Sequence, residues 1–487
     1  MITKHPPATV RAADLKAALP GLGRLVPRSP SLAVLGCVKV EVEAAAPQSV
    51  RLTTTDIDFS LSVTVPGTVE KGFTPFLLPL PRLRELVHGL RSDEVVPLGP
   101  AIKAPPVGEF PEIPLVRTPG LTLPEPVVTS LLRAFACASN DPTRAVLRSA
   151  FLDTSGVGDK AHRVVGTNGR HLFSSNSMHL PLKQSVILPD HPLWKWKPLV
   201  ESRPWTLRLG KDQHQAEVFR VEGQGPELAW SVTGRLLENP YPNYLQVIPG
   251  PDQFTTTVTL SDAALEAITR LVPRLPGKQL ANRPVGLHCE KGRIGLLARG
   301  ENDEPWILHP IDRCEMKGPD ATAFLNRDYL EKAAAFGLHR ISMSDEMSAV
   351  QFSRGGDLMV VMPVRAIDPS RIERPGLVPA VEQFAPSTKP SPRPTSLPPK
   401  PTGPDQPTKV PKPTLPAKPA DPLVQARQQV AEADEALLTA RKTLKGVRRS
   451  LHAARTQRSE AKRELGGFRG LLRKLQRGRK HEAKKAS

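Results

Sequence analysis

The sequence predicts an α+β protein with three tandem units, each with two helices packed on antiparallel sheets, followed by a linker and a helical tail. Three observations support this fold class. Helix-like segments recur in pairs, alternating strand-like runs lie between them, and a proline-rich stretch follows the third pair. The 487 residues leave room for about three ordinary domains.

Six amphipathic segments are typical of helices, and their spacing indicates an internal repeat. The first members of the three pairs begin at Ala12, Glu125 and Ser261, and the second members begin at Leu80, His191 and Leu325. Within the pairs the starts are 68, 66 and 64 residues apart. Ser261 and Asn326, at the starts of their segments, are suitable N-caps.

Short alternating runs such as "SVRLTTTDIDFSLSVTV" and "HRVVGTNGRHLFSSN" lie between the helical segments and predict antiparallel strands. We place three domains at residues 1–120, 121–250 and 251–366, and they are called the first, second and third repeats below. Between Pro369 and Pro422, 17 of 54 residues are proline, so residues 367–422 are expected to form an extended, disordered linker.

Residues 423–487 form a basic tail with an apolar seam. Val430, Leu437, Leu444 and Leu451 share one heptad position, which predicts a coiled coil, and a lone basic amphipathic helix remains the alternative. The tail has 18 Lys and Arg against 6 Asp and Glu, a net charge of +12 out of +19 for the chain. Such a tail favours a polyanionic partner.

Basic side chains occur on all six helical segments of the three repeats. Aromatic residues make up only 5% of the chain, which disfavours base stacking and favours phosphate contact without sequence readout. Solvated helix faces are the plain alternative. The candidate DNA-binding residues are Arg24, Arg82, Arg133, Lys195, Lys197, Arg203, Arg270, Arg274 and Lys278.

No pattern of a catalytic or metal site stands out, so we expect no enzyme activity, no metal and no cofactor. Asp56 and Asp58 form a D-x-D pair, but no further ligands accompany them and a polar turn is the favoured interpretation. The four cysteines lack zinc spacing and are expected to be buried, reduced thiols. Without a signal peptide or an 18-residue apolar window, the chain is expected to be cytoplasmic and free of the membrane.

Residues 1 to about 366 resemble the bacterial beta sliding clamp, the beta subunit of DNA polymerase III. The motifs are "SLAVLGCVKVEV" and "TTTDIDFSLSV" in the first repeat, "RAVLRSAFLDT", "VVGTNGRHLFSSN" and "YPNYLQVIP" in the second, and "FLNRDYL" and "LMVVMPVR" in the third. The resemblance implies three tandem DNA-clamp domains in a homodimeric ring around double-stranded DNA. It also implies a processivity factor whose partners are the replicative polymerase catalytic subunit and the clamp loader.

The resemblance further implies a pocket for partner peptides between the second and third repeats. Its residues here are Leu147, Thr167, Gly169, Arg170, Leu172, Pro242, Val247, Val360, Val361, Met362, Pro363, Val364 and Arg365. Asn168, His171 and Gln246 depart from the residues that the family usually has, namely Asp, Arg and Arg. In the loop "VPRSPSL", Arg28 lies near the place of a DNA-contacting basic residue in the family.

The end of the first repeat differs more from the family pattern than these single residues do. After its second helix, "SDEVVPLGPAIKAPPVGEFPEIPL" has six prolines and one convincing strand, so an edge hairpin is expected to be missing. In the family that edge pairs with the third domain of the next subunit. We therefore expect the tail to hold two subunits together or to add DNA affinity. The alternative function is a clamp-like DNA-binding scaffold that closes no standard ring and anchors DNA through its tail.

Overall fold

The computed structural model describes residues 7–43, 46–101, 104–156, 158, 162–176, 178–225, 228–301, 304–364 and 372–373. Arg365 of the predicted pocket, the predicted linker beyond residue 373 and the predicted tail all lie outside these ranges. No helix within the described ranges is long and apolar enough to cross a membrane.

Each of the three repeats has a strand, a helix, several antiparallel strands, a second helix and one or more closing strands, which confirms the predicted α+β class. The first has β1 (Ala8–Arg11), α1 (Ala12–Leu22), β2 (Cys37–Glu43), β3 (Ala46–Thr55), β4 (Phe59–Val69), β5 (Phe76–Pro79), α2 (Leu80–Val87) and β6 (Val95–Leu98). The second has β7 (Leu121–Leu123), α3 (Glu125–Cys137), β8 (Ser149–Asp153), β9 (Arg163–Thr167), β10 (His171–Ser175), β11 (Val186–Pro189), α4 (Lys197–Glu201), β12 (Trp205–Lys211), β13 (Glu217–Gln224) and β14 (Ala229–Arg235). The third has β15 (Thr256–Leu260), α5 (Asp262–Leu271), β16 (Pro284–Glu290), β17 (Arg293–Ala298), β18 (Trp306–Ile311), β19 (Cys314–Lys317), β20 (Ala321–Asn326), α6 (Arg327–Ala335), β21 (Arg340–Met343), β22 (Val350–Arg354) and β23 (Asp357–Val361), and β24 (Ile372–Glu373) follows.

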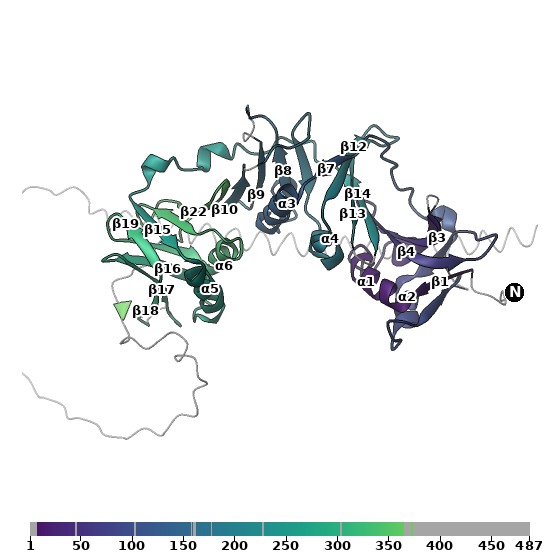
Figure 1. Ribbon diagram of the computed structural model, residues 1–487, viewed down its shortest axis with the longest axis horizontal. Coiled ribbons are helices and arrows are strands. Elements are labelled where there is room, and N and C mark those ends of the chain that lie inside the picture. Colours follow the sequence, from purple (N-terminus) through teal and green to yellow (C-terminus); the bar gives the residue numbers. More distant parts are fainter. Residues whose placement is uncertain are drawn as a thin grey trace, which may run out of the picture. The chain divides into compact units, whose positions relative to one another are not determined.

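Both predicted N-caps are confirmed. The Ser261 hydroxyl accepts a hydrogen bond from the Ala264 amide at 3.2 Å, and the Asn326 side chain accepts one from the Asp328 amide at 2.8 Å. α1 lies beside α2, and α5 lies beside α6 (Figure 1).

The predicted helix from His191 is split into a 3-10 turn (Pro192–Lys195) and the short α4. Trp194 and Trp196 are both buried, and two positions that are two residues apart cannot face the same side of one α-helix. The extended backbone at Trp196 lets its indole reach α1, where Nε1 donates to the Ala17 carbonyl at 3.2 Å.

Two sheets run continuously across the junctions between repeats. The larger has the order β5-β2-β3-β4-β14-β13-β12-β7 with β1 and β6 attached, and the next has the order β11-β8-β9-β10-β23-β22-β21-β15-β19. At each junction the third strand after a repeat's first helix, β4 or β10, pairs antiparallel with the last strand of the next repeat, β14 or β23. The repeats are thus joined by backbone hydrogen bonds as well as by packing.

The corresponding strand of the third repeat is β18, and no further repeat follows within the described residues. It belongs to a five-stranded sheet in the order β20-β16-β17-β18-β24. β24 pairs with it in parallel, with Ile372 opposite Trp306 and Glu373 opposite Ile307. The edge that continues the sheet at the other two junctions is therefore covered here only at its start, by β24.

The first repeat ends differently from the other two. After β6, the described residues 99–101 and 104–120 contain a 3-10 turn (Val107–Glu109) and no strand. This segment packs as irregular chain, and Phe110 contacts a small cluster that includes Val34 and Leu77. Proline removes the backbone donors that a strand pair needs, which accounts for the irregular path.

Candidate partner-binding site and nucleic-acid interface

The turn between β9 and β10 is held by side chains that bond to its own backbone. The Thr167 hydroxyl donates to the His171 carbonyl at 2.7 Å and accepts from the Gly169 amide at 3.0 Å. The Asn168 Oδ1 atom accepts from the amides of Arg170 and His171 at 2.9 and 3.1 Å. Gly169 has a φ of 84°, which glycine adopts without strain. The turn presents the exposed Arg170 at a fixed position.

Asn168 also connects this turn to the third repeat. Its Nδ2 atom donates to the Tyr329 hydroxyl of α6 at 3.1 Å while its Oδ1 serves the turn. An aspartate at this position would keep the turn bonds, and it could only accept a hydrogen bond from the Tyr329 hydroxyl, whereas Asn168 donates one. Asn168 thus bonds the turn of the second repeat to α6 of the third repeat.

His171 forms the centre of the same junction. Its buried imidazole stacks on Tyr329 with a 4.1 Å centroid separation, and Nδ1 lies 2.8 Å from the Asn168 Oδ1 acceptor. The imidazole is therefore protonated on Nδ1, and its unprotonated Nε2 lies 3.4 Å from the Lys332 ammonium nitrogen as an acceptor. Burial, and secondly the Lys332 charge, lower the pKa of His171 to about 3. An arginine here would place two cations side by side.

An apolar cluster lies behind the turn. Val165, Leu172, Tyr244 and Val360 are buried together, and Leu172 lies opposite Val360 in the pairing of β10 with β23. The pairing continues beyond the strand, because the Met362 amide donates to the Arg170 carbonyl at 3.0 Å. Large apolar side chains remain exposed on the flanking segments: Leu245 is 51%, Val247 50% and Met362 41% exposed. Exposed apolar groups beside such a cluster are typical of a protein-binding surface.

The structure brings part of the predicted pocket together and places other members elsewhere. Thr167, Gly169, Arg170, Leu172, Val360 and Met362 belong to the turn, the cluster or the paired strands. Leu147 ends a 3-10 turn (Ala145–Leu147) and is half-buried, Pro242 and Val247 lie on the exposed linker between repeats, and Pro363 is buried.

Val361 and Val364 face away from the cluster. Val361 packs in the core of the third repeat, and Val364 donates its amide to the Phe324 carbonyl at 2.7 Å. Val364 also packs on the group formed by Leu297, Trp306 and Phe324. Side chains alternate along a strand, which turns Val361 away from Val360, and Val364 lies beyond the end of β23.

Three residues near this pocket were absent from the predicted set: Tyr241, Tyr244 and Arg144. The Tyr244 hydroxyl donates to Asp153 at 2.6 Å, and Tyr241 stacks on Phe151 at 4.6 Å. Burial raises the pKa of both tyrosines well above its usual value. A Cβ atom on Gly169 would lie 3.6 Å from the Arg144 guanidinium. The motif "YPNYLQVIP" was the available signal for the tyrosines.

Basic side chains converge where α1 meets the second repeat. Lys16, Arg24, Lys195 and Lys197 line one depression, and Arg84 of α2 lies close to Gly23 at its edge. The Arg24 guanidinium donates to the carbonyls of residues 192 and 195. Lys197 pairs with Glu201, but within the described residues Lys16, Arg84 and Lys195 form no ion pair. We call these five residues the basic cluster, and five cations this close together suit a phosphate backbone.

The other candidate DNA-binding residues are dispersed. Arg28, Arg274 and Lys278 are exposed, whereas Arg82 pairs with Glu85 and Arg270 pairs with Glu266. Two differ in being half-buried: Arg133 forms an ion pair with Asp357 and lies over the Phe336 ring, and Arg203 lies over the Trp205 ring.

The remaining sequence motifs have structural roles. Asp56 Oδ1 accepts from the Phe59 amide at 2.8 Å in the turn between β3 and β4, in agreement with the favoured interpretation. No group of three potential metal ligands occurs among the described residues. All four cysteines are free thiols, and three are buried, but Cys314 is only half-buried, which corrects the prediction for that residue because it lies on the short outer strand β19.

Comparison with known proteins gives one group of relatives. No family model matches the sequence. The Beta sliding clamp of Synechococcus elongatus is 26% identical over 306 residues, which covers 59% of this chain and 78% of the relative. The beta subunit of DNA polymerase from Streptococcus pyogenes has a TM-score of 0.60 at 17% identity, covering 74% of this chain and all of that one. The DNA polymerase sliding clamp from Bacillus subtilis also has a TM-score of 0.60, at 16% identity, with the same coverage.

Proposed function

Because the chain is a homologue of the bacterial beta sliding clamp, we propose that it is a non-catalytic processivity factor of a replicative DNA polymerase. In this role it encircles double-stranded DNA and tethers the polymerase catalytic subunit through a peptide-binding pocket. A clamp loader places it on DNA, and the site of action is the cytoplasm. The relatives' names and the three repeats joined by continuous sheets support this function.

The basic cluster is the observation that best supports DNA contact. It combines residues of α1, α2 and the 3-10 turn and helix α4 of the second repeat, so it depends on the junction between two repeats. A clamp needs weak contacts that let it slide, and exposed lysine and arginine on helices provide phosphate contacts without base readout. The exposed Arg274 and Lys278 would extend this surface in the third repeat.

The exposed apolar residues beside the Leu172–Val360 cluster are the proposed site for the polymerase peptide. Met362 and Val247 provide adaptable apolar contact, and Arg170 provides a cation at the rim. Asn168 and His171 hold the turn beside this site and also contact Tyr329 and Lys332 of α6.

Closure of a homodimeric ring cannot follow the strand pairing that joins the repeats within the chain. By the rule of the two internal junctions, β18 would pair with the last strand of another copy's first repeat. That repeat has no strand in its described residues after β6, and β24 covers part of β18. We infer that closure relies on other contacts, and the predicted coiled coil over 423–487 is the segment best suited to provide them.

These same two features favour the second candidate function, a clamp-like scaffold that binds DNA without closing a ring. In that case the basic tail would anchor DNA and the pocket would still bind partners. The two candidates differ in whether the protein depends on DNA topology.

Primer extension tests the tethering role. The full chain is added with its polymerase and loader to a singly primed circular template, and the product length is measured. Met362→Ser removes an apolar anchor worth about 2 kcal/mol, so we expect about 30-fold weaker polymerase binding and short products at limiting protein. Leu32→Ser is the control, because Leu32 is 53% exposed and lies in the first repeat. Long products that are independent of the added chain would contradict the proposal.

A further inference from the structure

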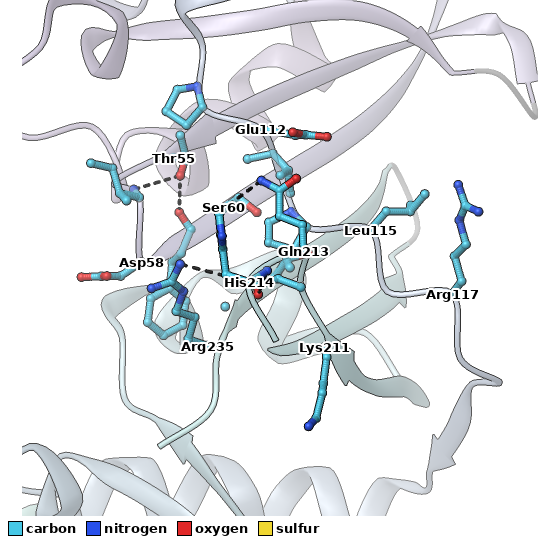
Figure 2. A pocket seen from close by; sticks show the side chains of 18 residues that line it. Thr55, Asp58, Ser60, Glu112, Leu115, Arg117, Lys211, Gln213, His214 and Arg235 are labelled. Atoms are coloured by element: carbon cyan, nitrogen blue, oxygen red, sulfur yellow. Dashed lines mark hydrogen bonds and ion pairs between the residues drawn. The ribbon is translucent and has the colours of Figure 1, made fainter. Parts of the chain in front are cut away.

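A second cavity lies at the junction of the first and second repeats. It has a volume of about 420 Å³ and lies where the β3–β4 turn, the segment 111–117 and the β12–β13 turn meet (Figure 2). Two large apolar side chains on its lining are unusually exposed: Ile57 is 60% and Leu115 is 63% exposed. Neither the DNA contact nor the polymerase pocket uses this cavity.

The β3–β4 turn at this cavity has a defined set of bonds. The Thr55 hydroxyl donates to the Phe59 carbonyl at 2.7 Å and accepts from the Ile57 amide at 3.0 Å. Asp56 Oδ1 accepts from the Phe59 amide at 2.8 Å. Ile57 has a φ of 88°, a strained conformation for a β-branched residue. Backbone strain of this kind is concentrated at binding and switch sites.

The same bonds recur 112 residues later in the β9–β10 turn of the polymerase pocket. Thr167 bonds to His171 and Gly169 at 2.7 and 3.0 Å, Asn168 accepts from His171 at 3.1 Å, and Gly169 has a φ of 84°. The two turns are therefore the same structure, and Ile57 occupies the position of Gly169.

The surrounding elements correspond as well. Ser60 lies opposite Thr233 in the β4–β14 pair, as Leu172 lies opposite Val360 in the β10–β23 pair. The segment "FPEIPLV" from Phe110 aligns with "YPNYLQV" from Tyr241, so each site has a linker with a proline at its second position. The cavity is the internal-repeat counterpart of the polymerase pocket.

The charges of the two sites differ at equivalent positions. Asp58 stands in the place of Arg170, and Glu112 stands in the place of Asn243. Within the described residues neither carboxylate has an ion pair. Figure 2 shows Asp58, Glu112, Arg117 and Lys211 at different places around the cavity. The rim of the cavity therefore has both carboxylates and cations.

The two other charged groups of the lining are already paired. Arg235 forms an ion pair with Asp212 at 3.6 Å, and the buried Asp212 carboxylate also accepts from the His214 amide at 2.8 Å. The charged groups of the lining that a ligand can pair with are thus Asp58, Glu112, Arg117 and Lys211.

We propose that this cavity is a second peptide site, which binds an extended segment of a partner protein. The segment has an aliphatic or aromatic anchor, with Lys or Arg on one flank and Asp or Glu on the other. The anchor packs on Ile57 and Leu115, and the flanking charges pair with the carboxylates and cations of the rim. The inference rests on the proposed function of the corresponding pocket between the second and third repeats.

Fluorescence polarisation with the full chain tests this site. The probes are fluorescein-labelled hexapeptides with one Leu-Phe anchor: Gly-Lys-Leu-Phe-Glu-Gly, Gly-Glu-Leu-Phe-Lys-Gly and the neutral Gly-Gln-Leu-Phe-Gln-Gly. We expect one of the two charged probes to bind more tightly than the neutral probe. Leu115→Ser should weaken its binding about tenfold and Asp58→Arg about threefold, whereas Met362→Ser should leave this binding unchanged.

The outcomes separate the two sites. Binding that responds to Met362→Ser and not to Leu115→Ser would overturn this inference and leave the polymerase pocket standing. No response of any probe to either variant would contradict both. Unlabelled peptides that cover residues 374–487 serve as competitors, and their displacement of the probe at micromolar concentration would assign the cavity to the chain's own tail and overturn the proposal of a partner.

Discussion

His171 makes the junction between the second and third repeats sensitive to pH. Its imidazole is buried between Tyr329, Asn168 and Lys332, and its pKa of about 3 lies below the ordinary value of 6.5. The folded chain therefore keeps this group neutral where the unfolded chain protonates it. The stabilisation is complete above pH 6.5 and is lost as the pH falls from 6.5 toward 3.

The size of the effect follows from the two pKa values. At pH 5, about 1.5 units below the ordinary pKa, His171 is protonated in the unfolded state and neutral in the folded state. This difference lowers the free energy of unfolding by about 2 kcal/mol relative to pH 7.5. His171→Gln removes this titration and keeps an acceptor for the Lys332 ammonium. At pH 7.5 the variant should be less stable by about 1 kcal/mol, because the ring stacking on Tyr329 is lost.

Urea titration followed by tryptophan fluorescence measures both proteins at pH 7.5 and pH 5.0. Other titrating groups act equally in the two proteins and cancel in the comparison. We expect the loss of stability on acidification to be about 2 kcal/mol larger for the unmodified chain than for the glutamine variant. An equal loss in both proteins would refute the assignment of a buried neutral imidazole.

Three other predictions concern packing, strain and DNA contact. Gly166→Ala should destabilise the chain by about 3 kcal/mol or more in urea titration, because the added Cβ would lie 2.1 Å from the Ala134 carbonyl oxygen of α3. Gly108→Ala is the control, because its Cβ meets no atom within 4 Å and the substitution should be neutral. Ile57→Gly should stabilise the chain by about 1 kcal/mol, because glycine adopts the φ of 88° without strain, and a loss of stability would contradict this. The double variant Lys195→Gln with Arg84→Gln should weaken binding to duplex DNA and reduce the slope of log K against log salt by about 2, and an unchanged slope would remove the basic cluster from the interface.

The sequence predicted elements whose signals are local. Ser261 and Asn326 begin their helices as expected because an N-cap acts over three residues. The split of the predicted helix at His191 was missed because it depends on burying Trp194 and Trp196 in different surroundings, which tertiary structure decides.

Long-range pairing limited the prediction of the candidate sites. β4 and β14 are separated by about 170 residues of chain, so their register cannot be inferred from periodicity. The correspondence between the Thr55 and Thr167 turns was visible only after the hydrogen bonds were known, because Ile57 hides the need for a positive φ that Gly169 makes obvious. Arg133 was predicted as a DNA contact from its charge, and its contacts with Asp357 and Phe336 depend on the fold.

Retention on DNA of defined topology tests the central proposal most directly. The full chain is loaded on nicked circular DNA, the complex is isolated by gel filtration, and bound protein is measured before and after one restriction cut, with blocked ends on a parallel sample. A ring that encircles DNA should be retained on the circle, dissociate within minutes after cutting, and remain on the linear DNA with blocked ends. Equal retention on circular and open linear DNA, with binding that falls steeply with salt, would contradict the ring and favour the scaffold.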